Sequence, residues 1–109
     1  MSNGSQDLRT KLSEEIGTAD WSLLAPHAQS EKLIVVDNAV VLLDAALAVA
    51  NNDTHRITHW IEGGQLTKLT PDQQTKLEDE QTAFFQFVIV APFVLAQRVL
   101  IAPQSTETL

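Results

Sequence analysis

An uncharged, strongly apolar run near the end of the chain limits the possible fold more than any other feature. The stretch FVIVAPFVLAQ covers residues 87–97, inside a charge-free window over residues 81–97. A membrane-spanning helix needs about 20 predominantly apolar residues. The uninterrupted apolar part here ends at Ala96, contains Pro92 and is soon followed by Arg98. The run is therefore predicted to be a core or interface element, and not a membrane anchor.

Two secondary structures fit this run, and self-association is a third consideration. FQFVIV, at residues 85–90, suits a strand buried on both faces, and Pro92 would end that strand or mark an edge. A helix over residues 82–100, kinked at Pro92, is the alternative, because periodicity cannot separate the two here. The aromatic and β-branched residues of FQFVIV favour the strand. A second apolar segment, residues 39–50, competes for a limited interior, so we also expect a homodimer interface.

The first third of the chain predicts two helices and a strand. Apolar residues recur every four positions in a helix expected over residues 6–16. Asp20 is a suitable N-cap for a short second helix that contains Pro26. LIVVD, at residues 33–37, is a compact β-branched run between polar segments, which indicates a buried strand.

The remaining segments predict three further helices and one short strand. Residues 38–50 are predicted to form a helix that is apolar on almost every side, and such a helix is typical of the centre of a fold. Asp53 caps the next helix, and Gly63 is expected to end it with a positive φ. QLTKL, at residues 65–69, alternates like a strand. TPDQ, at residues 70–73, has the pattern of a capping box, and its helix is expected to reach about residue 82.

These elements predict an α+β fold with four to five helices around a small sheet of two or three strands. A chain of 109 residues has the length of one domain. We expect a flexible tail at residues 1–5, a single globular domain at residues 6–102 and a second flexible tail at residues 103–109. Two helices joined by a tight turn and followed by a strand also have the order of a winged-helix core.

The charge balance argues against nucleic acid as a partner. The chain has 14 Asp and Glu against 7 Lys and Arg, a net charge of −7, and its basic residues are scattered. Binding to a phosphate backbone needs several basic residues, and the helix in the recognition position offers only Arg56. Nucleic acid and anionic membrane are therefore disfavoured partners.

Catalytic and redox motifs are missing from the sequence. The chain has no cysteine, which excludes thiol nucleophiles and fits a reducing compartment. Gly63 and Gly64 follow a helix, whereas the glycines of a phosphate loop open one. The polar start of the chain has no apolar signal region, so a cytoplasmic location is expected. We predict no cofactor and no enzymatic activity.

Two histidines and their neighbours are the candidates for a metal site. His55 and His59 lie four residues apart on one predicted helix, so both could reach one ion. Zinc needs at least three protein ligands, and Asp53, Glu62 or His27 would have to join. Nothing in the sequence brings them together, so two surface histidines are the favoured interpretation.

Four other residues complete the set of candidate interface or functional positions. Asp44 is a single acid on an apolar helix, and a buried acid needs a partner, for which Arg98 or Arg56 is available. Trp60 has the spacing of a core residue on its helix, and packing is favoured over ligand stacking for Trp60 and Trp21 alike. Phe93 lies within the apolar run of residues 87–97, and Arg98 is the charged residue that follows it.

Several short motifs resemble one bacterial family. They are WSLLAPHAQ from residue 21, IVVD from residue 34, ALAVANND from residue 46, HWIE from residue 59 and IVAPFVLAQ from residue 89. In this order they resemble domain of unknown function 2288, and most closely its cyanobacterial branch, over about residues 8–97. The family usually has a second acid near Val41 and a tryptophan near Leu77, and this chain has neither. The resemblance implies a bacterial protein and a core role for the last motif, but no reaction.

The sequence as a whole favours a small non-enzymatic interaction or accessory protein that acts through protein–protein contacts. A winged-helix-like transcriptional regulator is one alternative, and a small-molecule or metal-binding module is the other. The identity of the protein partner does not follow from the residues.

Overall fold

The apolar run forms a β-hairpin at the centre of the sheet. In the computed structural model, which describes residues 4–80 and 83–99, β4 (Phe84–Val90) and β5 (Phe93–Arg98) pair antiparallel. Pro92 lies in the turn between them, after a cis peptide bond, where its missing N–H interrupts no pairing. The predicted strand is confirmed, and the kinked-helix alternative is wrong. The second strand, after Pro92, was not predicted.

In the described residues, five strands form one mixed sheet in the order β1-β4-β5-β2-β3. β1 (Gly17–Asp20) is antiparallel to β4, β2 (Leu33–Val36) is parallel to β5, and β3 (Leu66–Thr67) is antiparallel to β2. The α+β class is confirmed, but the sheet has five strands and not two or three. β1 was not predicted, because its sequence, GTAD, lacks the alternation of apolar and polar residues that is typical of a strand. β1 is a strand through its pairing with β4, which is a tertiary contact.

Within the part of the chain that the structure describes, five helices surround this sheet: α1 (Gly4–Glu15), α2 (Trp21–Gln29), α3 (Leu42–Ala50), α4 (Thr54–Glu62) and α5 (Pro71–Asp79). The predicted N-caps are confirmed, because Asp20 accepts a hydrogen bond from Leu23 N–H and Asp53 accepts one from Arg56 N–H. The capping box of α5 is complete, with reciprocal hydrogen bonds between Thr70 and Gln73.

Some helix ends differ from their predicted positions. α3 begins at Leu42 and not at residue 38, because a turn at Asp37 precedes it, where the Ala39 N–H donates to the Asp37 carboxylate at 2.9 Å. The positive φ after α4 belongs to Gly64, at +78°, whereas Gly63 has a φ of −83°. α1 begins two residues earlier than expected, and α5 ends at Asp79, before residue 82.

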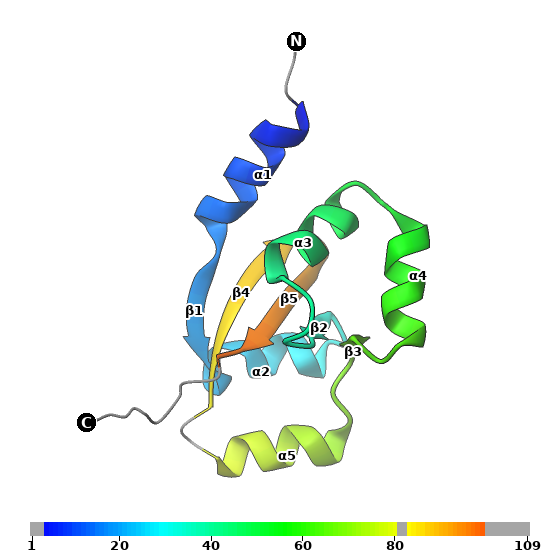
Figure 1. The fold of residues 1–109 in the computed structure, drawn as a ribbon. Coiled ribbons are helices and arrows are strands. Elements are labelled where there is room, and N and C mark those ends of the chain that lie inside the picture. Colours follow the sequence, from blue (N-terminus) through cyan, green and yellow to red (C-terminus); the bar gives the residue numbers. More distant parts are fainter. Residues whose placement is uncertain (1–3, 81–82, 100–109) are drawn as a thin grey trace, which may run out of the picture.

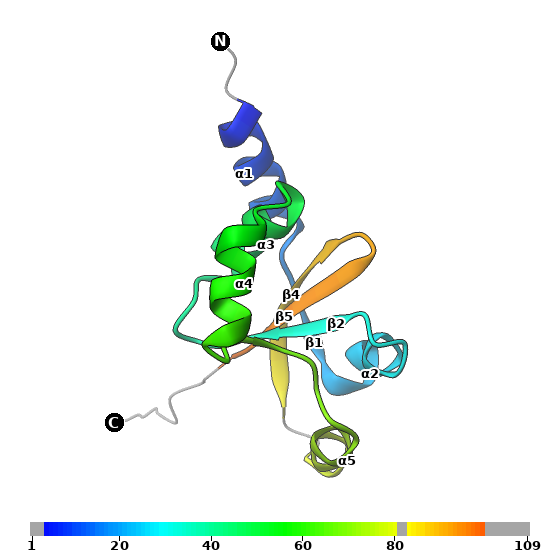
Figure 2. The same cartoon turned by 90° about the vertical axis from the view of Figure 1, so that its right-hand side faces the viewer.

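The sheet lies between two helical layers, as Figures 1 and 2 show. α1 and α3 cover one face, toward which Val88 and Leu95 point, and α4 packs against α3 at the edge of the sheet. α2 and α5 cover the other face, toward which Phe85 and Ala96 point.

β5 is buried on both faces from Val94 to Ala96, which explains its apolar residues. In β4, Phe84, Gln86 and Ile89 are exposed, so the prediction that this strand is buried on both faces is wrong. None of the helices in the described residues is long and apolar enough to cross a membrane.

Gln97, the last residue of the apolar run, connects the hairpin to the loop before α3. Its side-chain amide donates to the carbonyl oxygens of Asp37 and Val40, at 3.0 and 2.5 Å. The Asn38 side chain donates in turn to the Arg98 carbonyl oxygen at 2.9 Å. These bonds hold the start of α3 against β5, so the two apolar segments of the chain meet in one core.

Candidate functional site

An apolar groove of about 600 Å³ opens between α4 and the nearby end of the sheet. Its apolar lining comes from two helices and three strands: Ile34, Val49, Ile57, Ile61, Leu66 and Phe93. Its polar lining consists of Asn52, Thr67 and Lys68. A groove of this composition can hold an apolar group and orient it by a few polar contacts at the rim.

The groove exists because the sheet is too short to cover the apolar side of α4. α4 carries Ile57, Trp60 and Ile61 at helical spacing, yet only Trp60 is buried, at 9% exposure. Ile57 is half-buried, and Ile61 is 56% exposed. β3, the strand nearest to α4, has only two residues. Figure 1 shows α4 standing beside the sheet and not across it.

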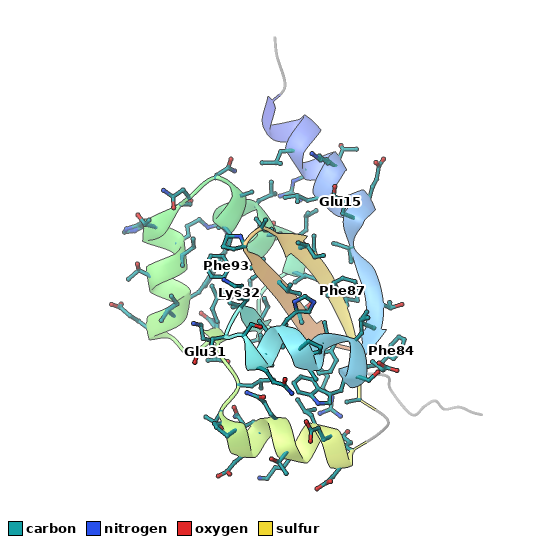
Figure 3. All side chains as sticks on the ribbon, turned by 180° about the vertical axis from the view of Figure 1, so that it is seen from behind. Glu15, Glu31, Lys32, Phe84, Phe87 and Phe93 are labelled. Carbon is teal, nitrogen blue, oxygen red and sulfur yellow. The ribbon has the colours of Figure 1, made fainter. Side chains whose placement is uncertain are left out.

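Phe93 is the candidate residue that the structure places in this groove. It is the first residue of β5 and is half-buried. The Val94 N–H donates to the Lys32 carbonyl oxygen at 3.0 Å, which fixes Lys32 next to this end of the hairpin. Figure 3 shows both residues on the side of the hairpin that faces α4. An interface role for Phe93 stays a prediction.

His55 and His59 lie on the outer face of α4, and both are exposed. With Thr54, Thr58 and Glu62 they line a shallow depression of about 340 Å³. In residues 4–80 and 83–99 no three His, Asp or Glu side chains form a group that could hold a metal ion. His27 is on α2, in the opposite helical layer.

Asp44 has a different partner from the two that were predicted. Arg9 of α1 donates to it at 3.1 Å, and both side chains are partly exposed. Arg98 instead pairs with Glu80, and the Arg56 guanidinium lies 4.7 Å from the centre of the Trp60 ring. The prediction of Arg98 or Arg56 is therefore wrong, because α1 packs against α3 and places Arg9 closer.

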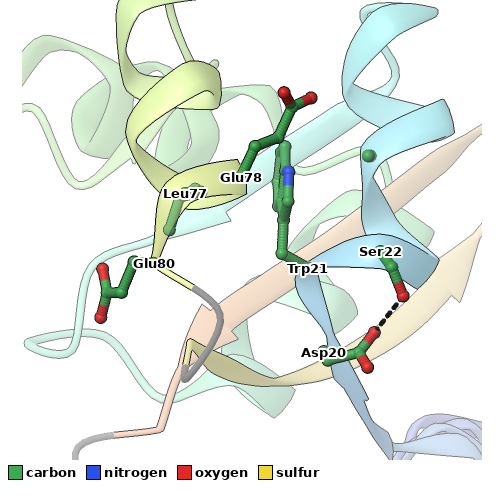
Figure 4. Close-up of a pocket in the computed structure, with 7 residues that line it drawn as sticks. Asp20, Trp21, Ser22, Leu77, Glu78 and Glu80 are labelled. Atoms are coloured by element: carbon green, nitrogen blue, oxygen red, sulfur yellow. Dashed lines mark hydrogen bonds between the residues drawn. The ribbon is translucent and has the colours of Figure 1, made fainter.

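A second cavity, of about 570 Å³, lies between α2 and α5 on the other face of the sheet (Figure 4). Trp21 lines it and is 6% exposed, and its indole Nε1 has no hydrogen-bond partner among the described residues. Asp20 lies at its edge, where the Ser22 hydroxyl, donating at 2.6 Å, and the Leu23 N–H lower the pKa of the carboxyl group.

Sequence reasoning missed this second cavity. The sequence predicted Trp21 as a packing residue and gave no role to the acids of residues 78–80. Glu78 and Glu80 line the cavity, because α5 packs against α2. The sequence indicated where α2 and α5 begin, through their capping residues. Capping residues do not show that two helices pack together.

Residues 7–98 match the model of a known protein family. This chain belongs to the family described as "Protein of unknown function (DUF2288)". The predicted resemblance to this family is confirmed, and its cyanobacterial branch stays a prediction. The DUF2288 chain is also similar to the NMR solution structure of PA1075 from Pseudomonas aeruginosa, with 27% identity and a TM-score of 0.74. The likeness covers 98% of this chain and 97% of that one. No curated protein matches the chain.

Proposed function

We propose that this DUF2288 protein is a non-enzymatic interaction protein that binds a partner protein in the groove between α4 and the sheet. The observation that carries the proposal is Ile61, which is 56% exposed although it lines an apolar groove with Ile57 and Phe93. Single exposed apolar residues are common, but a continuous apolar surface of this kind marks an interaction site.

The occupant is the apolar face of a partner helix. Grooves lined by aliphatic and aromatic side chains receive amphipathic helices through residues spaced three and four apart. Lys68 is the one charged side chain in the lining, so the partner helix carries an acidic residue beside its apolar face. A small molecule fits less well, because a ligand site encloses most of its ligand and Ile61 remains exposed.

The chemical composition of the groove supports a binding role without catalysis. General acid–base work needs a positioned carboxylate, imidazole or similar group. Among the described residues, the polar members of the lining are Asn52, Thr67 and Lys68, and none of these is a carboxylate or an imidazole. The histidines of α4 face outward, away from the apolar residues of the groove.

A winged-helix regulator has weaker support from the geometry. α3, α4 and β3 follow one another as in the predicted winged-helix order. However, Arg56, the one arginine or lysine of α4, lies over the Trp60 ring. Phosphate contacts supply most of the affinity for nucleic acid, and one such residue is too few.

Photo-crosslinking from two matched positions tests the proposal. A photoreactive phenylalanine analogue replaces Ile61 in one variant and Ile89 in the other, because these isoleucines are 56% and 54% exposed. Ile61 lines the groove, whereas Ile89, on β4, does not. Illumination in the native cell is expected to give one discrete adduct with another protein from position 61 only. Lys68→Glu should weaken that adduct by removing the complementary charge.

Three outcomes would contradict the proposal. Equal adducts from both positions would show that any exposed apolar residue captures proteins. No adduct from position 61 would leave the groove without a partner. An adduct between two copies of this chain, together with a dimer in sedimentation at micromolar concentration, would replace the partner protein by a homodimer.

A further inference from the structure

Two lysines lie at one end of the groove between α4 and the sheet, and both are exposed. Lys68 directly follows β3 and lines the groove. Lys32 directly precedes β2, and Figure 3 shows it beside Phe93 on the side of the hairpin that faces α4. The Lys32 carbonyl oxygen accepts a hydrogen bond from the Val94 N–H, which continues the parallel pairing of β2 with β5. The backbone of Lys32 is therefore held at the rim of the groove.

The pairing of β2 with β3 explains why the two lysines are neighbours. These strands are antiparallel, with Val35 opposite Thr67. One further step in this register brings Lys68 opposite Ile34, which also lines the groove. Lys32 is two residues from Ile34, and residues in such a diagonal relation across a strand pair are about 7–8 Å apart. The register thus brings together two ammonium groups that are 36 positions apart in the sequence.

The two lysines also differ from the arginines of the chain in having no ion-pair partner. In the described residues each arginine has a partner: Arg9 pairs with Asp44, Arg98 pairs with Glu80, and Arg56 lies over the Trp60 ring. Lys32 and Lys68 form no ion pair with any described residue. The end of the groove therefore combines two positive charges that no described carboxylate neutralises.

Two acids lie near these lysines in the sequence, and neither lines the groove. Glu31 lines a different depression, which Lys68 also borders, and it forms no ion pair with either lysine. Glu62 ends α4 and lines the shallow depression on the outer face of that helix. The Debye length is about 8 Å at physiological ionic strength, so more distant acids act weakly here. The rim of the groove is locally positive on a chain whose net charge is −7.

We propose that the helix received by this groove is acidic, with two carboxylates one helical turn apart that meet Lys32 and Lys68. This inference rests on the function proposed above, because it names the chemistry of the partner helix. Residues i and i+4 of a helix have Cβ atoms about 5–6 Å apart, and the flexible lysine stems can span the remaining difference. Charges at an exposed rim mainly speed association and select the partner.

Three designed helical peptides with a fluorescent label test the inference by anisotropy. Each has leucines at positions i, i+3, i+4 and i+7 for the groove. Beside the leucines, four residues apart, the first peptide has two glutamates, the second two glutamines and the third two lysines. General attraction to a chain of net charge −7 would make the lysine peptide bind best. The positive rim reverses this order, and the glutamate peptide should bind about fivefold more tightly than the glutamine peptide.

Variants that each remove one positive charge locate the effect. Lys32→Gln and Lys68→Gln should each lower the preference for the glutamate peptide about twofold, and the double variant should abolish it. Lys11→Gln and Lys76→Gln remove the same charge from α1 and α5, and they should leave the preference unchanged. Ile61→Ser, in the apolar lining, should weaken all three peptides alike.

The outcomes separate this inference from the proposed function. Equal binding of the glutamate and glutamine peptides, weakened by Ile61→Ser, would show that the groove receives a helix without selecting an acidic one. Tightest binding of the lysine peptide, or equal effects of Lys11→Gln and Lys32→Gln, would show that net charge governs binding, and the inference would be wrong. If no peptide binds at millimolar concentration, the groove does not receive a helix, and the proposed function is wrong as well.

Discussion

Arg9 of α1 and Asp44 of α3 form an ion pair with 3.1 Å between Nη2 and Oδ1. The two residues are 35 positions apart in the sequence, and the pair links the first helix to the central helix on the same face of the sheet. Asp44 is also in the first turn of α3, where the helix dipole favours a carboxylate. The lone acid of an apolar helix thus has a structural role.

We predict a small stabilisation from this pair. The Arg9 and Asp44 side chains are 52% and 35% exposed, and exposed ion pairs contribute about 0.2–1 kcal/mol. A double-mutant cycle with Arg9→Gln and Asp44→Asn, measured by urea unfolding, should give a coupling in this range that falls in high salt. Lys11→Gln, on the same helix, serves as the control. A coupling that persists unchanged in high salt would contradict a surface pair.

Asp20 should make the stability depend on pH in acid. The Ser22 hydroxyl and the Leu23 N–H lower the pKa of Asp20 below its ordinary value of 3.8. A carboxyl group with a lowered pKa stabilises the fold fully above the ordinary value and loses this contribution as the pH falls through the folded value. Asp20→Asn can still accept the capping bonds but cannot titrate. The variant's melting temperature should therefore fall less steeply below pH 4 than that of the native chain.

Thr70→Ala should loosen α5 more than the rest of the protein. The substitution removes the side chain that accepts from the Gln73 N–H, and the loss of such a cap costs about 1 kcal/mol. α5 has no fully buried residue that would hold it in place. Hydrogen exchange of its amides should accelerate, while β4 and β5 remain protected. Thr75→Ala, inside the same helix, is the control, and a similar acceleration there would argue against the cap.

Leu95→Ala should be among the most damaging substitutions in the hairpin. Leu95 is fully buried, and shortening a buried leucine costs about 2–5 kcal/mol through lost burial and the cavity left behind. Ile89→Ala removes a similar volume from a side chain that is 54% exposed, and should cost less than about 1 kcal/mol. Thermal or denaturant unfolding measures both. Equal losses would show that the face of β4 that carries Ile89 is more enclosed than the structure indicates.

The capped starts of α2, α4 and α5 were predictable because their signals are local, whereas α3 has no side-chain cap and its start was not. Asp53 is followed three residues later by the amide that it caps, and Thr70 and Gln73 satisfy each other within one turn. The strand of residues 85–90 was predictable in the same way, from its β-branched and aromatic composition.

The two cavities were not predictable because each is formed by segments that are distant in the sequence. The groove needs Phe93 from the hairpin and Ile61 from α4. No sequence pattern near either residue predicts that the two lie together. The second cavity needs Trp21 and Glu78, which meet only because α5 packs on α2. The exposure of Ile61 follows from the shortness of β3, which no pattern in QLTKL predicts.

The sequence by itself determined the α+β class, the capped helix starts and the strand before Pro92, because each depends on residues within a few positions. Only the tertiary structure decided the five-stranded order, the pairing of Asp44 with Arg9 and the apolar groove. Backbone pairing makes GTAD a strand although its side chains do not favour one. Whether an apolar side chain becomes core or surface depends on what the rest of the chain places above it, as Leu95 and Ile61 show.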